Sequence, residues 1–185
     1  MSAISSTDPS RSQARIRFEG AAATPLLTGE AATEALAELL DRAAVLIAFE
    51  QIGGGQAAMD MGMAYTKERY AFGRPVASFQ AIKHKFADMF VALELARANA
   101  YYGAWALSSA APDLPLAAAT ARVSATDAYW QISKENIQAH GGMGYTWEFD
   151  CHFYYRRSRA LALNLGGINR WEDKLVNALS EETAA

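Results

Sequence analysis

Two stretches of this 185-residue chain combine residue types that can hold an anionic ligand. In the first, residues 65–89, Arg69 stands at the end of a predicted helix, residues 72–75 turn the chain, and Gln80 opens the next helix. A guanidinium beside a turn and a helix N-terminus suits a phosphate or pyrophosphate, and an amide there can bond a base or ribose. A plain corner between two helices, with a surface arginine, explains the same residues without a ligand.

The second stretch, QAHGGMGYTWE at residues 138–148, has glycine at three of four consecutive positions. Gly141 can be the C-cap of the preceding helix, in the left-handed conformation that glycine allows. One cap needs one glycine, whereas Gly142 and Gly144 also let successive backbone N–H groups line a concave nest for an anion. A turn and an anion site therefore both remain open.

The other reactive side chains predict neither a metal site nor a nucleophile. Metal-binding helical bundles use Glu-x-x-His pairs, and Glu148 and His152 stand one residue too far apart for that motif. Cys151 has no catalytic context and is expected to be a buried, inert thiol. As the single cysteine, it also excludes an internal disulfide and fits a reducing compartment.

The elements that must position these residues are predicted to be helices. Apolar residues recur at helical spacing in five segments. The segments are about 30–68, the region between the breakers at 73–75 and 110–113, 113–140, about 150–163, and a last one from Ile168. The expected N-caps of the first three are Thr28, Ser78 and Asp113.

Three adjacent glycines, residues 53–55, lie inside the first predicted helix. Each costs a helix about 1 kcal/mol relative to alanine. This cost indicates either a close approach of another helix, or a kink, or a direct ligand contact.

Long helices with short connections predict an all-α fold, an antiparallel four- to five-helix bundle with one short N-terminal strand. Ala14, Ile16 and Phe18 alternate with charged residues, as in a half-buried strand. One strand makes no sheet, so it must pair with something outside this chain or fold back on the body. We therefore divide the chain into residues 1–28, a flexible N-terminus with strand and linker, and residues 29–185, the helical domain.

The composition is that of a soluble globular protein, with 51% hydrophobic and 20% charged residues. The net charge of -3 argues against nucleic acid as a partner, because phosphate binding favours a basic excess. The N-terminus lacks the apolar core of a secretory signal, and no apolar run reaches transmembrane length. We expect a cytoplasmic protein with no membrane partner.

Residues 65–89 and 138–157, in this order and spacing, resemble the C-terminal helical domain of acyl-CoA dehydrogenases. Residues 8–29 resemble the last strand of that family's middle β-domain and its exit linker. The resemblance covers nearly the whole chain. The family's N-terminal helical domain and most of its β-domain have no counterpart in this sequence.

The resemblance implies FAD as cofactor and an acyl-CoA thioester as substrate, oxidised across Cα–Cβ. A carboxylate removes the α-proton, and flavin N5 accepts the β-hydride. The family's helical domain pairs subunits into dimers and tetramers, and its two motifs touch the adenosine and pyrophosphate end of FAD bound mainly by a neighbouring subunit. The matching residues here are Arg69, Phe72, Phe79, Gln80, Gln138, Gly141 and Gly142.

The match fails at the catalytic base. Many family members have a glutamate, followed by glycine, where this chain has Leu165 before Gly166, and leucine cannot abstract a proton. Other members place the glutamate near the start of the first bundle helix, aligned here with about Ala43. Asp41 is close to that position and is the candidate base, whereas Glu50 lies about two turns further along.

Three hypotheses fit a family member without a flavin-binding β-domain and without the usual base. The chain is a fragment of a larger dehydrogenase, or the non-catalytic partner in a hetero-oligomer that divides one FAD site between unlike subunits. Such bacterial pairs are associated with sterol side chains and other bulky acyl-CoAs. The third hypothesis is a helical oligomerisation module that lost the chemistry. We expect the chain alone to be a poor dehydrogenase that works in a homo- or hetero-oligomer.

Overall fold

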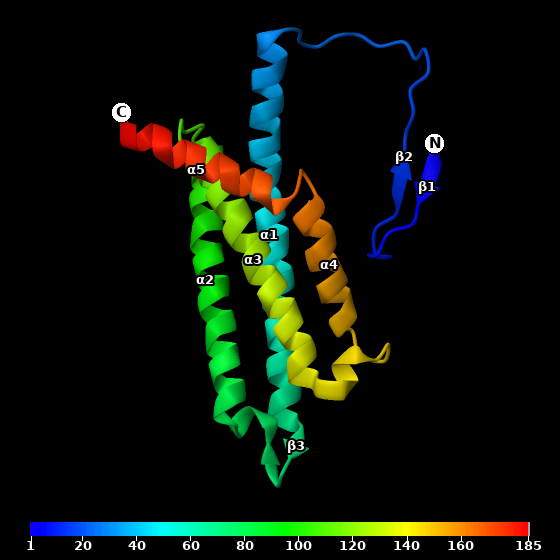
Figure 1. The fold of residues 1–185 in the computed structure, drawn as a ribbon, viewed down its shortest axis with the longest axis vertical. Helices are drawn as coiled ribbons and strands as arrows, with labels where there is room; N and C mark the ends of the chain where they lie inside the picture. The colour runs from blue at the N-terminus through cyan, green and yellow to red at the C-terminus, as the bar shows by residue number, and fades with distance from the viewer. Residues whose placement is uncertain (185) are drawn as a thin grey trace.

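Five helices make up the body of the computed structural model, which describes residues 1–184 (Figure 1). They are α1 (Glu30–Glu68), α2 (Gln80–Ser108), α3 (Leu114–His140), α4 (Cys151–Leu163) and α5 (Ile168–Ala184). The first four run alternately down and up alongside one another, and α5 crosses one end of them. Because α3 packs against each of the other four, it is the central helix. The predicted all-α antiparallel bundle is confirmed.

Glycines bring α1 close to its neighbours. A Cβ on Gly54 would lie 2.5 Å from Cζ of Tyr129 in α3, and a Cβ on Gly55 would lie 3.3 Å from Cδ1 of Leu93 in α2. The close-approach interpretation is therefore confirmed for these two, and α1 runs through them without a break. Gly53 differs, because a Cβ there would meet nothing within 4 Å.

The helices begin close to the predicted positions, but their first residues differ. The residues that precede α1 and α2 are Gly29 and Phe79, so the predicted caps Thr28 and Ser78 are wrong. The Ser78 hydroxyl instead donates to a carbonyl at the start of the short 3-10 helix before α2. Asp113 does precede α3, yet its side chain makes no cap hydrogen bond.

The N-terminal residues lie outside the bundle (Figure 1). β1 (Ser2–Ile4) pairs antiparallel with β2 (Gln13–Arg15), so the predicted strand is shorter than expected and finds its partner within the chain. Both strands are exposed, and Ile16 and Phe18 are 60% and 79% exposed, so the expectation of a half-buried strand is wrong. The physical reason is that this two-stranded sheet has no second layer on which to bury a face.

One buried carboxylate fastens this N-terminal segment to the bundle. Asp8 is 2% exposed, and Arg157 of α4 donates from Nη1 to its Oδ2 at 2.8 Å. Burial by itself raises the pKa of Asp8, but hydrogen bonds from Ser10 and the Arg157 guanidinium outweigh it and lower the pKa below 3.8. The attachment is completed by Arg11, which pairs with Glu50 of α1 at 3.1 Å.

A buried guanidinium joins α1, α3 and α4. Arg122 of α3 is 1% exposed, and its Nη1 donates to Gln51 of α1 at 2.8 Å and to Thr126 at 3.1 Å. Its Nη2 donates to the main-chain carbonyls of Leu161 and Asn164, at the end of α4. Burial lowers the pKa of Arg122 to about 10, so the side chain stays cationic at neutral pH. Arg122 thus donates to carbonyls at the end of α4, where a helix has C=O groups without a full set of intrahelical partners.

Replacing Arg122 with methionine keeps an apolar stem but removes the hydrogen bonds that its guanidinium donates to Gln51, Thr126 and the two carbonyls at the end of α4. Each hydrogen bond from a charged donor contributes about 1.5–3 kcal/mol, and other donors replace part of this loss, so we expect the free energy of unfolding, measured by urea denaturation, to fall by roughly 3–5 kcal/mol. The control is Arg159→Met, because Arg159 is exposed and its guanidinium lies over the Trp130 ring. That change should cost about 1 kcal/mol or less. Equal losses in the two variants would contradict a structural role for Arg122.

Candidate functional site

A two-residue turn shapes the corner between α1 and α2. β3 (Tyr70–Ala71) and β4 (Arg74–Pro75) pair antiparallel, and the residues between them are Phe72 and Gly73. Their φ angles are 53° and 77°, and left-handed φ at both positions is the signature of a type I′ hairpin turn. Gly73 is therefore explained by the turn, whereas Phe72 is held in a conformation that non-glycine residues seldom adopt.

The end of α1 and the end of α3 enclose one hollow of about 450 Å³. Arg69, which follows α1, lies on one side of it, and Gln138, Gly141 and Gly142 lie on the other. Two motifs that are far apart in the sequence thus meet in space. Arg69 and Gln138 are both exposed and so accessible to a ligand.

The other three predicted cofactor residues are not among those that line this hollow. Phe72 stands at the hairpin tip, 96% exposed, with its ring 6.3 Å from that of Phe79. The guanidinium of Arg74 lies over the Phe79 ring at 3.9 Å, and Gln80 is the exposed first residue of α2. Our sequence analysis did not single out Arg74, although its place directly after Gly73 was a usable signal for a second cation at this corner.

The three glycines of the loop after α3 have three different explanations. Gly141 has a φ of 59° and its N–H donates to the Gln138 carbonyl, so it is a cap, and its N–H is not available to the predicted anion nest. A Cβ on Gly144 would lie 2.4 Å from the Ile137 carbonyl oxygen, so packing requires glycine there. Gly142 has no left-handed φ, and a Cβ on it would meet nothing within 4 Å. Nothing in the chain requires glycine at position 142, which leaves room for a ligand.

Aromatic rings pack beneath the hollow. His140 is 3% exposed and stacks on Tyr65 with ring centroids 4.2 Å apart, and Phe149 lies edge-on to both rings. Burial lowers the pKa of His140, although a 2.8 Å hydrogen bond to the Asn136 carbonyl opposes that shift. A neutral imidazole donates this bond from Nδ1. His140 is therefore a fixed wall of the hollow.

Asp41, the candidate base, lies at the other end of the molecule. It is separated from Arg69 by 28 positions along α1, which is about 42 Å at 1.5 Å per residue. Asp41 is 3% exposed, pairs with Lys174 of α5, and borders a separate hollow of about 390 Å³. Burial raises the pKa of Asp41 and Glu38 adds to the rise, while Lys174 opposes it.

Leu165, which the sequence resemblance aligns with the base position, lies in the turn between α4 and α5. Its φ is 61° and that of Gly166 is 95°. The Leu165 side chain is partly buried and packs against an apolar cluster that includes Leu114 and Trp171. Ala43 is partly buried, and Glu50 is held by the ion pairs with Arg11 and Arg157.

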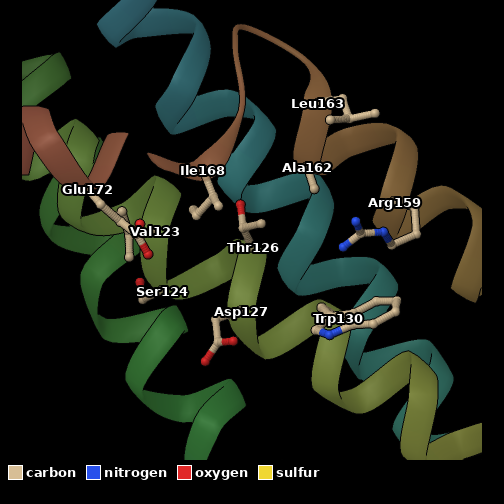
Figure 2. A pocket seen from close by; sticks show the side chains of 10 residues that line it. All are labelled: Val123, Ser124, Thr126, Asp127, Trp130, Arg159, Ala162, Leu163, Ile168 and Glu172. Atoms are coloured by element: carbon tan, nitrogen blue, oxygen red, sulfur yellow. The ribbon is translucent and has the colours of Figure 1, made fainter. Parts of the chain in front are cut away.

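A larger hollow, of about 500 Å³, opens between α3, α4 and the start of α5 (Figure 2). Trp130 forms one wall, with the guanidinium of Arg159 4.5 Å from its ring centroid. Asp127 and Glu172 also border it. None of the predicted site residues lines this hollow.

Other chemistry is sparse in the part of the chain that the structure describes. No group of three histidine, cysteine, aspartate or glutamate side chains there is placed to hold a metal ion. Cys151 is fully buried, and burial raises the pKa of its thiol to about 11, as expected for an inert cysteine. Among the same residues, no helix has the combined length and apolarity that crossing a bilayer requires.

Comparison with known proteins gives a consistent set of relatives. Residues 33–169 match the family described as acyl-CoA dehydrogenase, C-terminal domain. The acyl-CoA dehydrogenase IpdE2 of Mycobacterium tuberculosis is 38% identical over 159 residues, which are 86% of this chain and 45% of that protein. The chain spans less than half the length of this and the other curated relatives that lead the comparison.

Solved structures show the same similarity. Butyryl-CoA dehydrogenase from Megasphaera elsdenii superimposes with a TM-score of 0.75 and 29% identity, over 78% of this chain and 38% of that one. The Tcur3481-Tcur3483 steroid ACAD superimposes with a TM-score of 0.77 and 29% identity, over 82% of this chain and 42% of that one.

The buried imidazole beneath the first hollow makes stability depend on pH. Because the pKa of His140 is lowered from 6.5, folding favours the neutral ring, and the stability this brings is present above pH 6.5 and is lost as the pH falls through the lowered value. His140→Phe keeps an aromatic ring beside Tyr65 and removes the titration. Below pH 6.5 we expect the unfolding free energy of this variant to fall less steeply than that of the wild type, by at most about 1.4 kcal/mol per pH unit.

The control for this prediction is His84→Phe, which makes the same chemical change at an exposed position of α2. The pH profile of this control should match that of the wild type. If His140→Phe and the wild type lose stability in parallel from pH 6.5 downward, His140 is not held as a neutral ring.

Proposed function

The chain belongs to the acyl-CoA dehydrogenase family, and on that basis we propose that it supplies the adenine and pyrophosphate end of an FAD site in an oligomeric enzyme. The complete enzyme would oxidise an acyl-CoA thioester across its Cα–Cβ bond. The observation that carries the proposal is the meeting of Arg69, Gln138, Gly141 and Gly142 around one hollow. Members of the family use FAD, which on binding supplies the acceptor for the substrate hydride.

The residues around this hollow fit the dinucleotide end of FAD. Arg69 brings an exposed guanidinium, which pairs with phosphate oxygens through parallel hydrogen bonds. The exposed amide of Gln138 both donates and accepts, as recognition of a base or ribose requires. Gly142 borders the hollow, and a Cβ on it would meet nothing within 4 Å, so the backbone there is open to a ligand. Phe72 at the hairpin tip and Phe79 just before α2 offer aromatic surface to the same end of the cofactor.

The length of α1 supports assembly with another subunit. The approximately 42 Å along α1 between Asp41 and Arg69 exceeds the length of one dinucleotide cofactor. With Asp41 as the base, the two ends of this chain serve different FAD molecules, and the hollow at Arg69 receives a cofactor held mainly by a neighbour. We propose a homo- or hetero-oligomer with another acyl-CoA dehydrogenase-like subunit. The similar steroid ACAD is a pair of two proteins, Tcur3481 and Tcur3483, which supports the heteromeric form.

Asp41 is the candidate catalytic base on this chain. It borders a hollow, and burial raises its pKa, which is the direction that a general base requires. The ion pair with Lys174 would have to open for Asp41 to reach a substrate. Because Leu165 cannot act as a base, the second candidate function is a non-catalytic partner subunit or oligomerisation module. In that case the Asp41–Lys174 pair joins α1 to α5 and the base belongs to the partner.

The substrate class and the location are proposals by similarity. We propose a bulky acyl-CoA, such as a sterol derivative, because one similar structure is that of a steroid ACAD. The proposed location is the cytoplasm, in keeping with a single, buried cysteine.

Cofactor retention tests the site directly. In the complex with a flavin-binding partner, Arg69→Ala removes a charge-assisted contact worth about 1.5–3 kcal/mol, so FAD should bind at least about tenfold more weakly. Gly142→Ala should weaken FAD binding while leaving the fold unchanged, because its Cβ enters open space. The measurement is the visible flavin absorbance of the purified complex and its titration with FAD. Arg159→Ala is the matched control and should retain FAD as the wild type does.

Turnover of acyl-CoA by the active complex tests the base. Asp41→Asn keeps the shape of the side chain and removes its ability to take a proton, so turnover should fall by about 10²-fold or more. Glu50→Gln, which changes a carboxylate two to three turns further along α1, should leave turnover close to that of the wild type. Unchanged turnover in Asp41→Asn would remove Asp41 as base and favour the non-catalytic partner.

A further inference from the structure

A single ion pair joins the candidate base to the last helix of the chain. Lys174 of α5 donates a hydrogen bond from Nζ to Oδ1 of Asp41 in α1. Because α5 crosses one end of the bundle (Figure 1), this pair ties together two helices whose paired residues are 133 positions apart in the chain. Both side chains border the hollow of about 390 Å³. The pair therefore lies where a ligand of that hollow would meet it.

The two members of the pair differ in burial and in freedom. The Asp41 side chain is 4% exposed, whereas the Lys174 side chain is 30% exposed. Asp41 is a short side chain on the unbroken helix α1, but a lysine carries its ammonium group on a flexible four-carbon stem. Lys174 is therefore the member that can move away, and Asp41 is the member that stays.

The Lys174 ammonium group has a second favourable position close by. Its Nζ lies 5.6 Å from the centroid of the Trp171 ring, about one turn earlier on α5. Trp171 is 2% exposed and packs in an apolar cluster with Leu114, so its ring is held in place. A cation within about 6 Å of an aromatic ring is attracted to its face. Moving away from Asp41 therefore leaves the ammonium group with both this ring and water to stabilise it.

No other cation around this hollow is free to replace Lys174 beside Asp41. The other charged residues that border it all belong to α1, and they are Glu34, Glu38 and Arg42. Arg42 is held by Glu38 at 2.6 Å, and the lining residues from the start of α3 and the segment before it are uncharged. The positive charge next to Asp41 is therefore that of Lys174.

These contacts make the charge state of Asp41 depend on Lys174. Burial raises the pKa of Asp41, the hydrogen bond and charge of Lys174 oppose that rise, and Glu38 adds to it. While the ammonium group is in place, it favours the ionised carboxylate. Once it leaves, the same carboxylate is buried without a cationic partner, and such a group binds a proton more tightly.

We propose that Lys174 is a positioning residue for the candidate base: when closed onto Asp41 it keeps the carboxylate ionised, and when it leaves it frees that carboxylate to take a proton. The proton comes from the α-carbon of the thioester, the electron pair of that C–H bond stays on the substrate, and Lys174 remains an ammonium ion throughout. The inference rests on the proposed role of Asp41 as base, and it adds the regulation of that base by α5.

Carboxyl-carbon NMR of the full chain, with isotope-labelled aspartate, measures the Asp41 pKa without cofactor or partner, and Asp41→Asn identifies the resonance. Lys174→Met should raise this pKa by about 1–3 pH units, because a cation at this position lowers it by that much. Lys174→Arg restores the cation and should return the pKa close to the wild-type value. The matched control is Arg42→Met, which removes a cation that borders the same hollow but pairs with Glu38, and which should change the Asp41 pKa far less.

The far-UV circular dichroism of these variants should stay that of the wild type, which shows that the helices are intact. An unchanged Asp41 pKa in Lys174→Met, or an equal rise in Arg42→Met, overturns the proposal whatever the turnover of the complete enzyme.

The pH dependence of turnover in the active complex separates this inference from the proposed function. In Lys174→Met the acid limb of the kcat/KM profile should move to higher pH by the amount that NMR measures, and Lys174→Arg should restore it. A pair that only fastens α5 would not move this limb. If Asp41→Asn abolishes turnover but the acid limb of Lys174→Met stays in place, Asp41 is the base and the role of Lys174 is overturned. If Asp41→Asn retains turnover, the proposed base itself fails, and the regulation by Lys174 fails with it.

Discussion

One unbroken helix, α1, sets what this chain can do alone. Its 39 residues extend about 58 Å at 1.5 Å per residue, so they place Arg69 and Asp41 at opposite ends of the bundle. A cofactor held at one end cannot reach the other. The proposed division of an FAD site between subunits follows from this separation, and so does the expectation that the isolated chain is a poor dehydrogenase.

Contacts in the interior of the bundle hold α1 against its neighbours and fix the positions of the residues at its two ends. Small residues at the contacts, such as Gly54 against Tyr129, let α1 and α3 approach closely. Arg122 then fixes the end of α4, next to the turn that holds Leu165. At the other end, the stacked rings of Tyr65 and His140 support the loop with the exposed Gly142. Packing and site geometry therefore depend on the same few contacts.

Much of this arrangement could be predicted from the sequence, because apolar spacing and chain breakers determine helices locally. The five helices were predicted in this way, whereas Arg69 and the loop after α3 were assigned to one site only through the family resemblance. What could not be predicted depends on contacts between distant segments: the pairing of β1 with β2 and the packing that requires glycine at Gly144. The cap predictions for α1 and α2 failed by one position. Each helix begins one residue after the position that Thr28 or Ser78 would cap, so Gly29 and Phe79 precede the helices instead.

The most direct test of the central claim is photolabelling of the assembled enzyme with an FAD analogue that carries an azide on its adenine ring. The label reports where the adenine lies. The account predicts cross-links in the peptides that contain Arg69 and residues 138–143 of this chain, and none near Asp41. Labelling confined to the partner subunit, or located at the Asp41 end, would contradict it.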